Sequence, residues 1–587
     1  MIGAAASLAF ASKSGGNAWP GLDERWTRAE IAAAMANIAL ACAIVWTFHD
    51  SFWWPPDDGA YAYVADRLRN GDVLNRDLHD VHAGYVHFLH ALAFDLFGRD
   101  LASLRYPLAL LTVVQSAIVF LILRPLIGPL AICGGLAMSA LTFVQFLNPT
   151  PNWYALFLTV LLVTLLVVRA ERNTLGLVAI GFVIATIFLF RQLTGVLVGF
   201  GAVAYLLLPE HAVQARLHQK SVVAWIVATA MALALAAYLW FKTDAVSFVL
   251  YGFWPLATLA LVGVRTELNN RQAARLIVSL LAGAAIAVLP LVSYHLLHGS
   301  LLIWLDDTIL SAVSLTDLDF FRRSSYALML VSAATGAAGL GDPVAMLNGV
   351  FWLLVLLSPF ILGVAVLRTL QRDSGRIHPL PLLALFHALV SAHYAIPIYA
   401  LYSAGLTFAG LFAITRFRLS RTIALAATLI AVVVGLGFQA AQPLSRGLDG
   451  IMRGERRTLD ADGIPGARIR MEKRDQTMYL DLLKFVETHA SPQAAILGLP
   501  MTPELYFLSN RKPPVRFVIA PLSLRSERDV QQAWSNLEAT MPAAIIFKPD
   551  DKYTTPRVLE LMRRLQPHYR LCKTIGSFEL YAPACRT

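Results

Sequence analysis

Apolar residues fill long stretches of this chain, without the regular charged positions that one face of a soluble helix would carry. The first stretch runs from about Ala29 to His49. Further apolar stretches start near Leu104, Leu126, Trp153, Leu175, Leu193, Val222, Val246, Ala274, Leu347, Leu380, Tyr402 and Thr422. Each is roughly 17 to 25 residues long, the length of a helix that crosses a bilayer. The pattern therefore predicts about thirteen membrane spans.

The pattern changes after about Gln439, where a charged segment punctuated by proline begins. With roughly 145 residues this segment is long enough to bury a core of its own. Its periodicity predicts helices over Asp475–Ala490, Ser526–Met541 and Pro556–Leu565, and strands over Ala494–Leu499 and Ala543–Phe547. Strands that alternate with helices indicate a small α/β domain. The predicted class is an α-helical polytopic membrane protein with a C-terminal α/β domain.

Composition agrees with this class, because 57% of the residues are apolar and only 15% are charged. The mean hydropathy of +0.60 excludes an ordinary soluble globule. The net charge of +10 falls mostly on short loops, so it indicates topology and not nucleic-acid binding. Alternate loops carry the cations, namely Arg124, Arg169, Arg172, Arg216, Lys220, Arg265, Arg271, Arg275, Arg368, Arg372, Arg376, Arg416, Arg418 and Arg421.

Basic loops lie on the cytoplasmic side of a membrane protein, which places the amino-terminal arm inside and, with an odd number of spans, the C-terminal segment outside. We expect a cytoplasmic arm over residues 1–28, a membrane domain over 29–440 with its first outer loop at 50–103, and an outer domain over 441–587. Cys42 and Cys133 fall within apolar spans. Cys572 and Cys585 flank a predicted hairpin in the outer domain, where a disulfide and two free thiols are both compatible with the sequence.

The first outer loop begins with two adjacent carboxylates, Asp57 and Asp58, directly after two prolines. It continues with two amphipathic stretches, Tyr61–Arg69 and Tyr85–Phe97. One explanation of the pair is structural, because Asp often caps a helix and one could begin near Gly59. The alternative is chemical, because a carboxylate can act as a general base.

The segment PPDDGAYAYVADRLRNGD closely resembles the first-loop motif of the GT-C glycosyltransferases, especially the lipid A aminoarabinose transferases and the protein O-mannosyltransferases. In their motif P-D-E-x-x-Y, Asp57 matches the first acid, Asp58 replaces the Glu and Tyr61 matches the Tyr. The segments RDLHDVHAGYVHFLHALAFDLFG, FLNPTPNWYALFLTVLL and SAHYAIPIYAL are also similar to family segments, in the same order.

The resemblance implies an inverting transfer of a sugar from a polyprenyl-phosphate donor to a lipid, glycan or protein acceptor. It places the chain in a bacterial inner membrane, with its active site and C-terminal domain in the periplasm. Asp57 is then the expected base, and Asp58 would orient the acceptor or bind a divalent ion. A need for a metal stays open.

The donor phosphate requires cations at the outer face. The candidates are Arg191, Arg322, Arg323 and His82. The simpler explanations are an interfacial anchor at Arg191 and, for Arg322 and Arg323, an ion-pair cluster with the acidic run Asp306, Asp307, Asp317 and Asp319. Candidates for sugar or acceptor binding are Tyr61, Tyr85, Asn148, Asn152, His393 and Tyr394, although a lone His is more often structural.

The chain departs from the family pattern at two places. Relatives commonly carry Lys before Pro-Pro, where this chain has Asp80, Val81 and His82. A second acidic position of many relatives corresponds to Asn148 or Asn152, and an amide can bind a hydroxyl but cannot act as a base.

Two other functions fit parts of the pattern. An O-antigen ligase or polymerase would also use a lipid-linked glycan, with Arg and His in a late outer loop as its functional residues. A transporter or flippase for such lipids would predict inverted repeats and charged residues in the middle of spans, and the sequence has neither.

Overall fold

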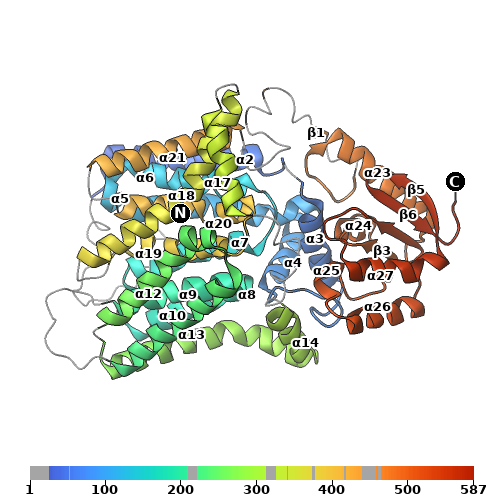
Figure 1. The fold of residues 1–587 in the computed structure, drawn as a ribbon, viewed down its shortest axis with the longest axis horizontal. Helices are drawn as coiled ribbons and strands as arrows, with labels where there is room; N and C mark the ends of the chain where they lie inside the picture. Colours follow the sequence, from blue (N-terminus) through green and yellow to red (C-terminus); the bar gives the residue numbers. More distant parts are fainter. Residues whose placement is uncertain are drawn as a thin grey trace.

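The computed structural model describes residues 25–51, 53–208, 221–266, 268–311, 325–339, 342–372, 377–414, 418–438, 448, 452, 458–459 and 464–586. A large group of helices occupies one part of the molecule and a mixed helix and strand unit occupies the other (Figure 1). The two short helices of the first loop, α3 (Pro55–Arg69) and α4 (Tyr85–Phe97), lie between them.

Except for α17, the apolar helices of the first part overlap the predicted spans. They are α2 (Arg28–Phe48), α5 (Tyr106–Ile127), α6 (Ala131–Ala140), α7 (Pro151–Val167), α8 (Thr174–Phe190), α9 (Gln192–Leu207), α10 (Val222–Lys242), α12 (Phe253–Arg265), α13 (Asn270–Leu297), α17 (Tyr326–Ala338), α18 (Pro343–Arg372), α19 (Pro379–Ala388), α20 (Pro397–Ile414) and α21 (Arg418–Phe438). Short α11 (Ala245–Ser247) and the π-helical turn Phe248–Gly252 extend α12 backwards.

Within the described residues, eight helical stretches are long and apolar enough to cross a membrane, and six apolar helices are shorter. Large apolar side chains such as Leu233, Trp240 and Leu297 point outward, with 66%, 83% and 84% of their surface exposed. Such exposure suits lipid and not water. The predicted polytopic helical class is confirmed. The 13-residue helix α17 was not predicted, and it packs against α18.

The C-terminal unit has the predicted α/β character. Its four-stranded sheet has the order β3–β4–β6–β5, formed by β3 (Ile496–Leu499), β4 (Ala544–Phe547), β6 (Phe578–Ala582) and β5 (Arg570–Ile575). Strands β3 and β4 are parallel, whereas β6 pairs antiparallel with β4 and β5. The helices are α23 (Lys473–His489), α24 (Pro503–Ser509), α25 (Ala520–Ser523), α26 (Glu527–Ala539) and α27 (Pro556–Leu565), and a two-stranded sheet joins β1 (Thr458–Leu459) to β2 (Met471–Glu472). Cys572 and Cys585 form a disulfide.

Close packing joins the first loop to the C-terminal unit. Helix α3 contacts α24 so closely at Gly59 that a Cβ atom there would lie 2.3 Å from the backbone nitrogen of Glu504. The backbone N–H of His79 donates to the carbonyl oxygen of Arg516 at 2.8 Å. The Arg516 guanidinium forms two hydrogen bonds, of 2.7 and 3.1 Å, with the buried carboxylate of Asp307. These contacts hold the C-terminal unit over the first loop.

Candidate active site

The first turn of α3 sends its two carboxylates in different directions. Pro55 and Pro56 begin the helix, in positions where their missing N–H groups cost nothing. Asp58 is fully buried, and its Oδ2 atom accepts the backbone N–H of Trp54 at 2.9 Å. Its two oxygens also accept hydrogen bonds of 3.1 and 3.2 Å from Nη2 of Arg105. Asp58 therefore stabilises the start of α3, and the helix begins four residues before the predicted Gly59.

Asp57 instead faces a cavity of about 160 Å³. Its Oδ2 atom accepts a hydrogen bond from Nδ2 of Asn148 at 2.7 Å. Burial raises the pKa of Asp57 to about 6, and the neighbouring Asp58 charge adds to the increase, while Asn148 and Lys552 oppose it. A carboxylate with this pKa is largely ionised at pH 7 and can still accept a proton.

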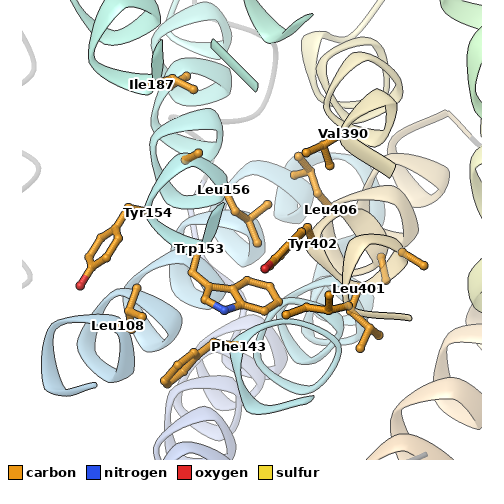
Figure 2. Packing of buried hydrophobic residues seen from close by; sticks show 14 of the residues in the cluster. Leu108, Phe143, Trp153, Tyr154, Leu156, Ile187, Val390, Leu401, Tyr402 and Leu406 are labelled. Atoms are coloured by element: carbon orange, nitrogen blue, oxygen red, sulfur yellow. The ribbon is translucent and has the colours of Figure 1, made fainter. Parts of the chain in front are cut away.

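Asn148 is held in place by an aromatic cluster at the start of α7. Its Oδ1 atom accepts the indole N–H of Trp153 at 3.4 Å. The Trp153 ring packs edge-on against Tyr402 with 4.6 Å between centroids, and Phe143 and Leu401 lie close by (Figure 2). The side chain of Asn152 does not line the cavity, and its Oδ1 atom has no hydrogen bond within the described residues. Of the two Asn candidates, the structure brings Asn148 to Asp57.

Several parts of the chain contribute to the cavity wall. Besides Asp57 and Ala60, the lining consists of Tyr61, His79, Asp80, Val81, His82, Arg191, Tyr394, Tyr399, Val518, Ile519 and Leu522. The last three belong to the C-terminal unit, so this unit closes one side of the cavity. Sequence reasoning suggested that the outer domain covers the site or recognises the acceptor, but it did not identify His79, Tyr399 or the residues of this closing segment. The hydrophobic periodicity of the C-terminal helices and strands does not indicate which surface they pack against.

Arg191 lies at the junction of α8 and α9, where the chain leaves one helix and enters the next. Its Nη2 atom donates to the hydroxyl of Tyr399 at 3.4 Å. Gln192 anchors the same junction to the first loop, because its Nε2 atom donates to the carbonyl oxygen of Val81 at 2.7 Å. The guanidinium of Arg191 is therefore positioned at the cavity wall.

Asp80 and His82 of the same wall lie beside a third residue of the first loop, the fully buried His87, which does not line the cavity. The Oδ1 atom of Asp80 lies 2.8 Å from Nδ1 of His82 and 3.1 Å from Nε2 of His87. Burial opposes the ionisation of Asp80, but the two imidazoles outweigh it and hold the pKa of this carboxyl well below its usual range. The hydroxyl of Tyr61 lies 3.4 Å from Nε2 of His82.

The other candidates have different surroundings. Tyr85 points away from the cavity, and its hydroxyl donates to the carbonyl oxygen of Ala287 in α13 at 2.6 Å. His393 lies behind the wall, with Nδ1 2.7 Å from the Tyr238 hydroxyl and its ring 3.9 Å from that of Tyr394. Arg322 and Arg323, together with Asp317 and Asp319, lie outside the described residues.

The other two members of the predicted acidic run, Asp306 and Asp307, pair with the C-terminal unit. Asp306 contacts Arg525 at 3.3 Å, and Asp307 contacts Arg516. Both acids therefore have arginine partners that the sequence pattern did not indicate.

A second cavity, of about 480 Å³, lies between α8, α9, α10 and α13. All the side chains that line it are apolar, among them Ile184, Phe188, Val203 and Met231. Phe188 and Gly195, which contribute to this cavity, stand on either side of Arg191 in the sequence. The apolar cavity therefore includes residues three and four positions from Arg191 along the chain.

Residues 81–241 match the family described as dolichyl-phosphate-mannose-protein mannosyltransferase. No curated protein matches the sequence. ArnT from Cupriavidus metallidurans, solved with undecaprenyl phosphate, is 14% identical over 94% of this chain and 98% of its own, with a TM-score of 0.41. The oligosaccharyltransferase AglB from Archaeoglobus fulgidus, solved with an inhibitory peptide and a dolichol-phosphate, is 13% identical over 95% of this chain and 75% of its own, with a TM-score of 0.42. The family match confirms, for residues 81–241, the predicted resemblance to protein O-mannosyltransferases, and the low TM-scores add no weight to it.

Proposed function

We propose that this protein is an inverting glycosyltransferase that uses a polyprenyl-phosphate sugar. Its residues 81–241 match the mannosyltransferase family. The observation that carries this proposal is Asp57, a carboxylate with a pKa of about 6 that faces a polar cavity and is oriented by Asn148. Such a group meets the two requirements of a general base, which are access to the substrate and a pKa near the working pH.

In the proposed reaction, the hydroxyl oxygen of the acceptor attacks the anomeric carbon of the sugar. Asp57 takes the hydroxyl proton, and the bond from the anomeric carbon to the phosphate oxygen breaks with its electron pair remaining on the phosphate. The product is the glycosylated acceptor, and polyprenyl phosphate leaves with added negative charge. Arg191 lies at the same cavity and would stabilise that charge. Tyr61, Tyr394 and Tyr399 offer hydroxyls for the sugar.

The apolar cavity supports a lipid donor. Its walls come from four helices and contain no polar side chain, which suits an isoprenoid chain. Since it begins beside the residues that flank Arg191, a donor could place its tail there and its phosphate at the guanidinium. This arrangement favours a lipid phosphate over a nucleotide sugar.

The positive-inside rule supports a periplasmic site. Within the described residues, two hydrogen bonds join three of the predicted basic loops at one end of the bundle: Nη2 of Arg275 donates to Oγ1 of Thr174 at 2.7 Å, and Nη2 of Arg265 donates to the carbonyl oxygen of Gln371 at 3.4 Å. We assign this end to the cytoplasm. The site and the C-terminal unit would then face the periplasm of a bacterial inner membrane, and a lipid, glycan or protein there would be the acceptor.

The test is transfer of radiolabelled sugar from a panel of synthetic polyprenyl-phosphate donors to membrane lipid and protein fractions. Asp57→Asn should lower the rate about 10²- to 10⁴-fold, the usual contribution of a positioned base. Asn148→Asp is a matched variant, because it retains the size of the side chain but repels the Asp57 carboxylate. Transfer at the normal rate by a folded Asp57→Asn protein, or no transfer from any donor, would contradict the proposal.

A further inference from the structure

The cluster of Asp80, His82 and His87 has the composition of a metal site. One ligand-type atom from each residue lies within 4.8 Å of the others. The turn at Gly84, which has a φ of 129° and precedes α4, reverses the direction of the chain. As a result His87, in the first turn of α4, lies next to Asp80. In a tetrahedral Zn²⁺ site, neighbouring ligand atoms stand about 3.3 Å apart. The separations of the Asp80 oxygen from the two imidazole nitrogens, 2.8 and 3.1 Å, need to open by only a few tenths of an ångström, and the three ligand atoms all lie within 4.8 Å of one another.

Burial closes the cluster on one side and leaves the other side open. The His87 side chain is fully buried, and within the described residues neither of its ring nitrogens has a hydrogen bond, although Nε2 lies near Asp80. The Asp80 and His82 side chains are each 15% exposed, and both residues line the polar cavity with Asp57 and Arg191. An ion held here would have protein ligands behind it and an open coordination position toward the cavity.

A second residue supports the orientation of one imidazole. His82 directs Nδ1 toward Asp80, while its Nε2 atom lies 3.4 Å from the hydroxyl of Tyr61. Metal-binding histidines usually donate their other N–H to such an outer partner, which fixes the tautomer. Tyr61 therefore has a role as an outer-shell residue in addition to its place in the cavity wall.

We propose that Asp80, His82 and His87 bind one divalent transition-metal ion, with Zn²⁺ as the best match, and that its open position faces the phosphate of the donor. Two imidazoles and one carboxylate with a free fourth position are typical of catalytic zinc sites. Magnesium and calcium prefer oxygen ligands throughout. The part that concerns the donor rests on the proposed function, whereas the metal site itself does not.

The negative charge of Asp80 in the cavity wall gives a reason for a bound metal ion there. A carboxylate at the cavity would repel a phosphate diester, but a bound divalent cation reverses the sign of that charge. The ion would then act together with Arg191 on the leaving polyprenyl phosphate.

The test uses purified full-length protein in detergent, stripped with a chelator and titrated with Zn²⁺ by calorimetry and with Co²⁺ by visible absorption. We expect one ion per chain and the absorption bands of low-symmetry, four- or five-coordinate Co²⁺. His82→Ala and Asp80→Asn should abolish binding, and Tyr61→Phe should weaken it about 10-fold with unchanged stoichiometry. His298→Ala is the control, because this histidine is exposed and distant in sequence from the cluster.

Circular dichroism establishes that each variant is folded, and Asp80→Asn, which preserves side-chain size, serves if His82→Ala does not fold. Absence of binding in folded wild-type protein, or unchanged binding in a folded ligand variant, would overturn the metal site. Full-rate sugar transfer by metal-free protein would overturn its role at the phosphate and leave the proposed function intact. Zinc binding without transfer from any donor would support the site and contradict the proposed function.

Discussion

The polar cavity around Asp57 and the apolar cavity between α8, α9, α10 and α13 are built from opposite materials, although both include residues near the α8–α9 junction. Ionisable groups reach the first from loops and helix ends, among them Asp80, His82 and Arg191. The second is formed by the faces of four helices, and its named lining residues are apolar throughout. Loop positions can carry reactive groups at the membrane surface, whereas helix faces in lipid must remain apolar.

The neighbouring residues Asp57 and Asp58 also have contrasting surroundings. Asp58 accepts hydrogen bonds that stabilise the start of α3, whereas burial at the cavity raises the pKa of Asp57. Stability and chemistry are thus divided between adjacent carboxylates, and variants of the two should have opposite effects on stability.

The largest effect is expected for Asp58→Asn, which leaves the buried Arg105 guanidinium without the Asp58 carboxylate. We expect a loss of about 3–5 kcal/mol in the free energy of unfolding. Asp57→Asn should instead stabilise the protein at pH 7 by up to about 3 kcal/mol, because burial penalises the ionised carboxylate. The native state of wild type retains the Asp57 proton up to about pH 6, so this gain should disappear as the pH falls below about 4. Thermal unfolding of both variants at pH 7 and pH 4 measures the contrast, and equal shifts would contradict it.

A second matched pair tests how the C-terminal unit closes the polar cavity. Arg516→Ala removes the arginine partner of the fully buried Asp307 carboxylate and should destabilise the contact by about 3 kcal/mol. Arg525→Ala breaks a partly exposed pair with Asp306, which should cost less than about 1 kcal/mol. Hydrogen exchange of the segment around His79 reports the difference. Similar exchange in the two variants would show that the Asp307 contact does not hold the unit in place.

The pH dependence of catalysis sharpens the role of the polar cavity. Because Asp57 must be ionised to accept a proton, kcat/KM should be level above about pH 6 and fall about tenfold per pH unit below it. Radiolabel transfer between pH 4.5 and pH 8 measures this profile. A profile without an acidic limb would remove Asp57 from the role of base.

The smallest effect concerns the apolar cavity. Val203→Trp fills part of the groove and should raise KM for a full-length polyprenyl donor about tenfold, equivalent to about 1.4 kcal/mol, with kcat unchanged. A short-chain donor should be little affected, because it does not occupy the groove. Leu233→Trp is the control, since Leu233 is an exposed lipid-facing residue of α10 that does not line the cavity. Equal KM changes for both donors would place the isoprenoid chain elsewhere.

Part of the site could be predicted because it is local in sequence. Asp57, Asp58 and Tyr61 share one helical turn, and the resemblance of that turn to a known motif directed attention to it. The spacing of Asp80, His82 and His87 was also visible, but a His is more often structural than a ligand, and nothing local indicated that a turn at Gly84 would bring the three together. Tyr399 and Leu522 could not be found, because they reach the cavity through contacts between distant segments.

The sequence by itself determined the helical membrane class, the C-terminal α/β elements and the position of the first-loop motif, because hydrophobic length and periodicity act within one element at a time. Only the tertiary structure decided which carboxylate faces the cavity and which Asn contacts it. It also decided that Arg516 forms an ion pair with Asp307, which lies 209 positions earlier in the chain. These choices depend on burial and on the direction of side chains across packed elements, which no local pattern specifies.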